Sequence, residues 1–191
     1  MTVSPQHPYL TPEQYLEAEK HSPIKHEYID GEVYAMAGAS DAHVTIAINL
    51  TTLLRSCLRG SNCRLYASDM KLRIESRNRF YYPDLLVTCD DRDRSTNYYK
   101  RFPTIVIEIL STSTESFDRG DKFADYCELD SLQDYLLISQ NRQRVDRFSR
   151  DSQNRWIFTR HEVGDVLTID RINFSCAVAD IYEDVEIDRI G

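Results

Sequence analysis

The sequence predicts a mixed α/β fold, an α+β arrangement in which a mixed central sheet is flanked by helices. Two nearly uninterrupted apolar runs, Thr104 to Ser111 and Phe80 to Thr88, are typical of strands buried on both faces. Residues 43–59 carry the strongest helical period in the chain, with apolar residues on one stripe. Buried strands and an amphipathic helix of this kind indicate one shared core.

Length and composition favour a single domain over residues 1–191. The chain has 41% hydrophobic residues, six glycines and six prolines, and neither a low-complexity segment nor an internal repeat. A chain of this size can bury a sizeable core.

Cysteine usage and hydropathy predict a soluble, cytoplasmic protein. The five cysteines are widely spaced, form no Cys-x-x-Cys pair and lie mostly within apolar runs, so we expect reduced core residues rather than disulfides or zinc ligands. The N-terminal stretch Met1 to Leu10 lacks the apolar core of a signal peptide. No run approaches the ~20 apolar residues of a spanning helix, so we expect no membrane association.

The net charge of −8 argues against a protein that coats nucleic acid through bulk electrostatics, but it does not exclude a nuclease. Basic residues gather locally in predicted loops and hairpins: Arg77 and Arg79; Arg92, Arg94, Lys100 and Arg101; Arg142, Arg144, Arg147 and Arg150. Because acids are interspersed among them, solvated surface charge is the favoured interpretation of each cluster.

The chain is expected to begin with a helix and a hairpin. A capping-box pattern, Thr11-Pro12-Glu13-Gln14, predicts a helix that runs to about His21. Asp30-Gly31 then favours a type I′ hairpin turn, whose register pairs Glu27 with Tyr34 and places Glu27 and Glu32 on one face. A solvated hairpin face is favoured over a role for these acids beside a metal.

In the predicted helix 43–59, His43 falls at the N-terminal end of the apolar stripe, and Gly60 is placed to end the helix. A histidine there is more often structural than a ligand, although its position would let it reach a pocket. His43 is therefore a secondary site candidate.

Further elements follow in order. Cys63 to Ile74 alternates with a slip near Ser68-Asp69, which predicts one long, bulged strand. A helix is expected from about Asp118 to Leu129, where Asp118 and Lys122 have the spacing of an ordinary surface pair. The C-terminal part is expected to form a strand and an antiparallel meander, through residues 134–139, 145–148, 156–161 and 166–170.

Two acids interrupt the apolar strands. Glu108 shares a strand face with Val106 and Leu110 and would be desolvated unless a charge, a proton or a metal meets it. Asp84, behind Pro83, interrupts the other run. Either acid alone is more often structural than catalytic. Side by side, however, they would repel each other unless a cation bound between them, and hard oxygen ligands on rigid strands suit Mg²⁺ or Mn²⁺.

These residues resemble the Uma-two family of restriction-endonuclease-like proteins, a branch of the PD-(D/E)XK nuclease superfamily. The likeness runs from about Leu10 to Tyr182 and rests on these segments: Pro83-Asp84, Ile107 to Ser111, Ser113-Thr114, Asp118 with Lys122 and Tyr126, Asp134 to Ile138, the hairpin Glu27 to Glu32, and His43. The resemblance implies a restriction-endonuclease-like core with an N-terminal hairpin and a C-terminal meander.

The resemblance also implies roles. Asp84 and Glu108 would be the metal-binding and catalytic acids of an endonuclease that hydrolyses DNA with Mg²⁺ or Mn²⁺. Where the superfamily places a lysine two residues after the second acid, this sequence has Leu110, and the resemblance implies that Lys122 supplies the missing cation. Glu27 or Glu32 would add an oxygen ligand, and His43 would contact phosphate or a metal-binding acid. A homodimer is also consistent with the resemblance.

Two alternatives remain open at this point. Leu110 and the acidic net charge favour a catalytically silent member that keeps the fold as an interaction module. In the other alternative, internal partners satisfy Asp84 and Glu108, which are then purely structural.

Overall fold

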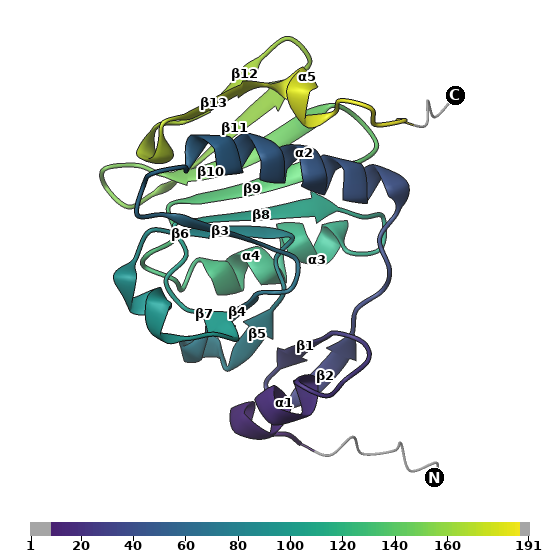
Figure 1. Ribbon diagram of the computed structural model, residues 1–191, viewed down its shortest axis with the longest axis vertical. Helices are drawn as coiled ribbons and strands as arrows, with labels where there is room; N and C mark the ends of the chain where they lie inside the picture. The colour runs from purple at the N-terminus through teal and green to yellow at the C-terminus, as the bar shows by residue number, and fades with distance from the viewer. Residues whose placement is uncertain (1–8, 188–191) are drawn as a thin grey trace.

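The structure, a computed structural model, describes residues 9–187 and has a mixed α/β architecture (Figure 1). Each of its two larger sheets is mixed, since β8 and β9 are parallel in one and β4 and β7 are parallel in the other. The six-stranded sheet has the spatial order β11 (Trp156–Glu162), β10 (Arg144–Arg150), β9 (Asp134–Ser139), β8 (Ile105–Leu110), β6 (Leu85–Thr88), β3 (Arg64–Ala67). The five-stranded sheet has the order β2 (Glu32–Ala35), β1 (His26–Ile29), β5 (Arg79–Tyr81), β4 (Lys71–Ile74), β7 (Tyr99–Lys100).

The helices are α1 (Pro12–Glu19), α2 (Asp41–Cys57), α3 (Glu115–Arg119), α4 (Asp121–Tyr126) and α5 (Val178–Ile181). Three short 3-10 helices, η1 (Glu75–Arg77), η2 (Asp91–Ser95) and η3 (Asp170–Ile172), lie in the connections. A separate hairpin of β12 (Val166–Ile169) and β13 (Phe174–Ala177) precedes α5.

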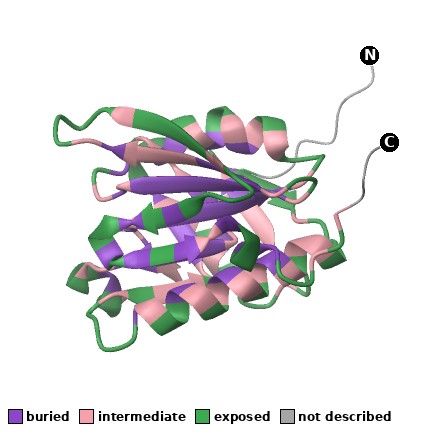
Figure 2. Ribbon diagram, turned by 90° about the horizontal axis from the view of Figure 1, so that it is seen from above, coloured by how far each residue is buried: buried purple, intermediate pink, exposed green. Residues whose placement is uncertain are grey.

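The centre of the molecule is the parallel pair β8 and β9, in which every residue is buried. Figure 1 shows α2 on one face of this sheet and α3 and α4 on the other, and Figure 2 shows the buried strands between exposed outer surfaces. Ile105, Ile107 and Ile109 pack into the core on the α2 side. Val106 and Leu110 pack into the core on the α4 side, which is the face that Glu108 shares.

The predicted N-terminal helix and hairpin are confirmed. Thr11 caps α1 in a capping box with Gln14, and β1 pairs with β2 so that Glu27 lies opposite Tyr34. Asp30 and Gly31 have φ values of 48° and 95°, as a type I′ turn requires. Tyr28 of β1 pairs with Phe80 of β5, so the hairpin is the edge of the five-stranded sheet.

The prediction of one central sheet is wrong, because the chain passes repeatedly between two larger sheets, and two of these passages fall within a predicted strand. The expected long strand Cys63 to Ile74 divides into β3 and β4, with Ser68 at a positive φ of 30° between them. The expected strand Phe80 to Thr88 divides into β5 and β6 around Pro83, which cannot donate a ladder hydrogen bond. Asp84 therefore lies in a break just before a strand, not within one.

Two further predictions, a helix from Asp118 to Leu129 and a C-terminal meander, agree with the structure only in part. The expected helix from Asp118 to Leu129 breaks at Gly120, whose dihedrals of −111° and −102° are outside the helical region, and so becomes α3 and α4. The predicted meander is confirmed for β9, β10 and β11, but β12 leaves it and pairs with β13.

The prediction that all five cysteines are reduced is also wrong. Cys63 and Cys89 form a disulfide, because β3 and β6 pair Arg64 with Thr88 and bring the two flanking cysteines together. Their separation of 26 residues gives no local signal of this contact. Cys57, Cys127 and Cys176 are free thiols.

Within residues 9–187, no helix combines the length and the apolar character that crossing a bilayer requires. Most of the N-terminal stretch that lacks a predicted signal core, residues 1–8, lies outside the described residues.

Candidate active site

Asp84 and Glu108 lie next to each other on one face of the six-stranded sheet. β6 and β8 are antiparallel with Leu85 opposite Ile107, so the same register places Asp84 opposite Glu108. The backbone N–H of Asp84 donates to Oε2 of Glu108 at 3.4 Å, and the backbone N–H of Ile109 donates to Oδ2 of Asp84 at 2.7 Å. The predicted neighbours are therefore brought together, although only Glu108 lies within a strand.

Glu108 is buried, with 4% of its surface exposed. Its Oε1 accepts a hydrogen bond from the hydroxyl of Tyr126 at 2.8 Å and lies 3.0 Å from Nζ of Lys122. Burial raises the pKa of Glu108 to about 8, with Lys122 acting in the opposite direction. Because this value already includes the effect of Lys122, a further cation beside the carboxylate would favour its ionised form at neutral pH.

The side chain of Lys122 is also buried, and its ammonium is directed at the acids. Besides Glu108, its Nζ lies 3.2 Å from Oε1 of Glu27 and 3.5 Å from Oδ1 of Asp118. Burial lowers the pKa of Lys122, but these three carboxylates raise it by more, so the ammonium stays protonated. The ammonium also lies 5.3 Å from the ring centroid of Tyr81. Lys122 is thus not the exposed partner of Asp118 that its spacing alone suggests.

Two of the three secondary candidates join this cluster. Nε2 of His43, near the start of α2, lies 2.9 Å from Oδ1 of Asp84. Glu27 reaches Lys122 from β1 and also accepts from the backbone N–H of Tyr82 at 3.3 Å. Glu32 does not join: it is exposed, and its Oε2 accepts from the hydroxyl of Tyr34 at 2.5 Å.

Sequence reasoning gave no site role to Asp118 or Tyr126, yet both contact the cluster. Tyr126 donates to Glu108, and Asp118 is buried, which raises its pKa although Lys122 opposes the shift. The spacing was the available signal: residues 118, 122 and 126 are four apart and so lie on one helical face. The contacts persist across the break at Gly120 because α3 and α4 pack over the same sheet face.

Leu110 cannot supply a cation here. Its side chain is 3% exposed and packs in the apolar core on the α4 side. Its backbone carbonyl accepts a hydrogen bond from Nε2 of Gln140 at 2.8 Å. The cation beside Glu108 therefore comes from α4.

The charges of the cluster favour a further cation. Carboxylates of Glu108, Asp118 and Glu27 surround the ammonium of Lys122, and a fourth, that of Asp84, lies beside Glu108. Within residues 9–187, no three histidine, cysteine or acidic side chains form a ready-made metal cage. Two adjacent carboxylates instead fit the way Mg²⁺ is usually held, through one or two acids, water and substrate phosphate. The residues present thus fit a hydrated Mg²⁺ or Mn²⁺ rather than an enclosed structural metal.

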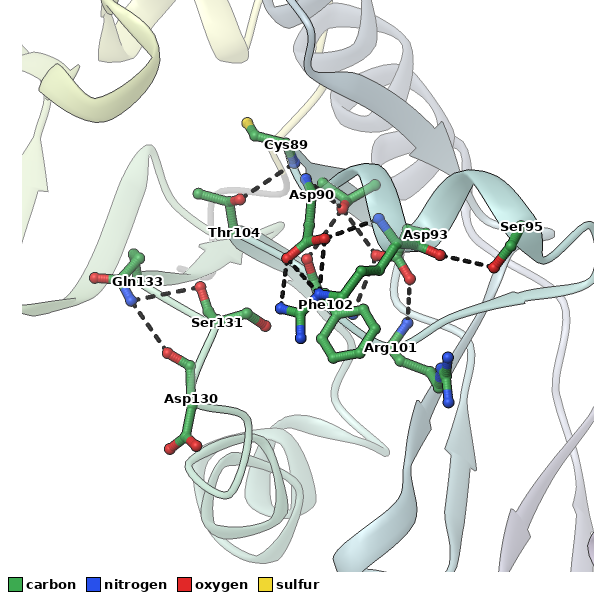
Figure 3. Close-up of polar contacts among 12 residues, drawn as sticks. Cys89, Asp90, Asp93, Ser95, Arg101, Phe102, Thr104, Asp130, Ser131 and Gln133 are labelled. Atoms are coloured by element: carbon green, nitrogen blue, oxygen red, sulfur yellow. Dashed lines mark hydrogen bonds and ion pairs between the residues drawn. The ribbon is translucent and has the colours of Figure 1, made fainter.

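A cavity of about 700 Å³ opens at the other end of β8, where Thr104 precedes the strand (Figure 3). Its arginines already face carboxylates: Arg92 contacts Asp90 at 2.6 Å, and Arg101 contacts Glu75 at 3.3 Å. The buried Asp93 shapes this region by accepting backbone N–H groups of Arg101 and Phe102 (Figure 3). None of the acids around Lys122 lines this cavity, so we place the candidate active site at Asp84 and Glu108.

The chain matches the sequence model of the Uma2 family, described as putative restriction endonuclease, over residues 12–179. Two uncharacterized proteins of Synechocystis sp. are similar to it in sequence. Protein slr1290 is 40% identical over 175 residues, which cover 92% of each chain. Protein sll1609 is 34% identical over 152 residues, which cover 78% of this chain and 86% of the other.

A solved structure shares the fold. The crystal structure of a putative nuclease belonging to DUF820 from Anabaena variabilis aligns with a TM-score of 0.73 and 15% sequence identity. The alignment covers 91% of this chain and 98% of that one. The arrangement of sheets and helices described above is therefore found in a second protein.

Proposed function

The chain belongs to the Uma2 family, and from this premise we propose that it is a metal-dependent endonuclease with a restriction-endonuclease-like core that hydrolyses DNA phosphodiester bonds. The observation that carries the proposal is the buried contact of Glu108 with Lys122, next to Asp84. Burying an acid and an ammonium in a protein core costs desolvation free energy. Groups whose pKa values are shifted in this way are concentrated at functional sites.

Asp84 and Glu108 would hold Mg²⁺ or Mn²⁺. His43 and the backbone N–H of Ile109 each contact one oxygen of Asp84, which fixes the orientation of that carboxylate. Tyr126 fixes Glu108 in the same way. When bound there, a divalent ion would lower the pKa of a coordinated water and stabilise negative charge on the phosphate.

Lys122 would stabilise the negative charge that develops on the phosphate in the transition state. Because its pKa is raised, the ammonium acts as a fixed cation and hydrogen-bond donor and does not serve as a general base. Its Nζ lies within 3.5 Å of carboxylate oxygens of Glu108, Glu27 and Asp118. To contact a phosphate oxygen, the ammonium would have to give up one of these contacts, and the contact with Asp118, at 3.5 Å, is the longest.

Nicking of supercoiled plasmid in Mn²⁺ or Mg²⁺ tests this proposal. We expect cleavage by the wild type that EDTA stops and that Asp84→Ala abolishes. The control is Asp69→Ala, which removes an exposed acid that pairs only with Lys25 among the described residues. Cleavage that survives Asp84→Ala would contradict the proposed site.

A catalytically silent interaction module is the second candidate, favoured by Leu110 and the net charge of −8, and one observation also fits the alternative in which the two acids are purely structural. Each acid already has internal partners, since Lys122 and Tyr126 contact Glu108 while His43 contacts Asp84. If the wild type cleaves no DNA with any divalent ion, this second function is preferred. A homodimer stays a prediction, which light scattering would test.

A further inference from the structure

A cluster of arginines lies in the same row of the sheet as the candidate catalytic acids. Glu108 pairs with Leu137, Leu137 with Asp146, and Asp146 with Arg160, across β8, β9, β10 and β11. Paired residues point to the same face of a sheet, so Asp146 and Arg160 lie on the face that carries Glu108. With strands about 4.8 Å apart, Asp146 is about 10 Å from Glu108.

Asp146 holds three guanidinium groups around one fully buried carboxylate. Nε of Arg160 lies 2.8 Å from Oδ1, while Nη1 of Arg119 and Nη2 of Arg144 lie 2.9 Å and 3.5 Å from Oδ2. Arg119 follows Asp118 at the end of α3 and so joins the cluster to the candidate active site. These contacts fix arginines from three separate elements in one orientation.

The cluster has an excess of positive charge. The four arginines Arg119, Arg142, Arg144 and Arg160 stand against the three acids Asp146, Glu115 and Glu162. Among the described residues, Nη2 of Arg119 and Nε of Arg144 are buried without a hydrogen-bond partner, and so is Oδ2 of Asp146, which faces both arginines only through the ion pairs above. Burial lowers the pKa of Arg144, and its arginine neighbours lower it further. Clustered positive charge of this kind favours the binding of an anion, although the net charge of the whole chain is −8.

The cluster is also partly accessible. The side chain of Arg160 is 47% exposed and that of Arg119 is 29% exposed, and Arg142, in the turn before β10, is exposed as well. Arginine presents a planar fork of donors that matches the oxygens of a phosphate group.

We propose that Arg119 and Arg160, oriented by Asp146 and with the charge of the buried Arg144 behind them, bind a backbone phosphate of the DNA substrate beside the scissile phosphate. This inference rests on the proposed function. The contact is to phosphate and therefore independent of base sequence.

Binding of a fluorescein-labelled DNA duplex, followed by anisotropy in Ca²⁺ at several salt concentrations, tests the inference. We expect Arg160→Gln to weaken binding about tenfold, as the loss of a charge-assisted hydrogen bond implies. The slope of log K against log salt should fall by about one, since one phosphate contact is lost. Arg155→Gln is the matched control, because Arg155 is an exposed arginine that pairs with one acid, Asp151.

The outcomes separate the two proposals. If the wild type binds the duplex but Arg160→Gln behaves like Arg155→Gln, the arginine contact is wrong and the proposed nuclease is unaffected. If the wild type does not bind, both are wrong. If Arg160→Gln also lowers the unfolding temperature, binding by Arg160→Lys separates loss of folding from loss of the contact. Lysine keeps the positive charge, so the inference requires Arg160→Lys to keep the wild-type slope of log K against log salt.

Discussion

Lys122 reaches Glu108 from α4, whereas the residue two positions beyond Glu108 on its strand is the buried Leu110. The flexible stem of a lysine allows the charged group to lie well away from its backbone, so one ammonium can be presented from either element. The other residues of the site also come from separate parts of the chain: His43 contacts Asp84, and Tyr126 contacts Glu108. At the scale of residues, the proposal therefore predicts that removing Lys122 and removing the charge of Glu108 have different effects.

Lys122→Met should reduce plasmid nicking about 10²-fold or more, because one preorganised electrostatic contact to the transition state is lost. Metal affinity should change little, since Lys122 is not a ligand. Lys20→Met is the control, because Lys20 is an exposed lysine that pairs with Glu17. Nicking that is unchanged in Lys122→Met but lost in Asp84→Ala would refute the role of Lys122.

Glu108→Gln should abolish the stabilisation of the protein by Mg²⁺ while leaving it folded. The amide keeps the shape of the side chain and an oxygen that can accept from Tyr126, but it loses the charge that binds a cation. Thermal unfolding with and without Mg²⁺ measures the effect, with Glu128→Gln as an exposed control. An equal Mg²⁺-dependent shift in the wild type and Glu108→Gln would place the metal elsewhere.

At the scale of elements, periodicity located most helices and strands but not the two changes of sheet that fall within predicted strands. The apolar pattern resumes directly after Ser68-Asp69 and after Pro83-Asp84, so the sequence around these breaks resembles that of longer, bulged strands. Glu108 was predictable because it interrupts a buried run. The arginine cluster was not, because Arg119, Arg144 and Arg160 become neighbours only through the register of β10 with β11 and the packing of α3.

Asp146 should stabilise β10 and β11 in a pH-dependent way. Burial raises its pKa, but Arg160, Arg119 and Arg144 lower it by more, so the pKa of the folded protein lies below the ordinary value. This contribution is complete above about pH 4 and is lost as the pH falls through the lowered pKa. Asp146→Asn should therefore cost about 3 kcal/mol at pH 7, where it leaves three arginines without their carboxylate.

Urea unfolding of the wild type and Asp146→Asn at pH 7 and near pH 3 measures this difference. The difference should shrink at the lower pH, where the wild-type carboxyl begins to protonate. Asp130→Asn, at an exposed acid in the connection between α4 and β9, is the control. A difference that grows on acidification would contradict the ion-pair account.

At the scale of the whole molecule, β8 joins the two larger apolar clusters of the core. Its alternate residues contribute to the apolar cluster under α2 and to the cluster under α4, so the two clusters share one strand. We therefore expect the chain to unfold as one cooperative domain. The disulfide between Cys63 and Cys89 ties the edge strand β3 to β6 at the end of the sheet away from Asp84.

Leu50→Ala tests this cooperativity. Leu50 is 1% exposed in the cluster under α2, and its truncation should cost about 2–5 kcal/mol. Far-ultraviolet and near-ultraviolet circular dichroism should report one transition that shifts as a whole. Two transitions, only one of them sensitive to Leu50→Ala, would show that the clusters unfold separately.

The most direct test of the proposed metal site is anomalous diffraction from crystals soaked in Mn²⁺. The proposal predicts a peak within ligand distance of the carboxylates of both Asp84 and Glu108, and no peak there in Glu108→Gln crystals. Glu108→Gln is suited to this comparison because it keeps the side-chain shape at a buried position. A wild-type structure without manganese at these carboxylates, or with manganese bound only elsewhere, would contradict the proposed site.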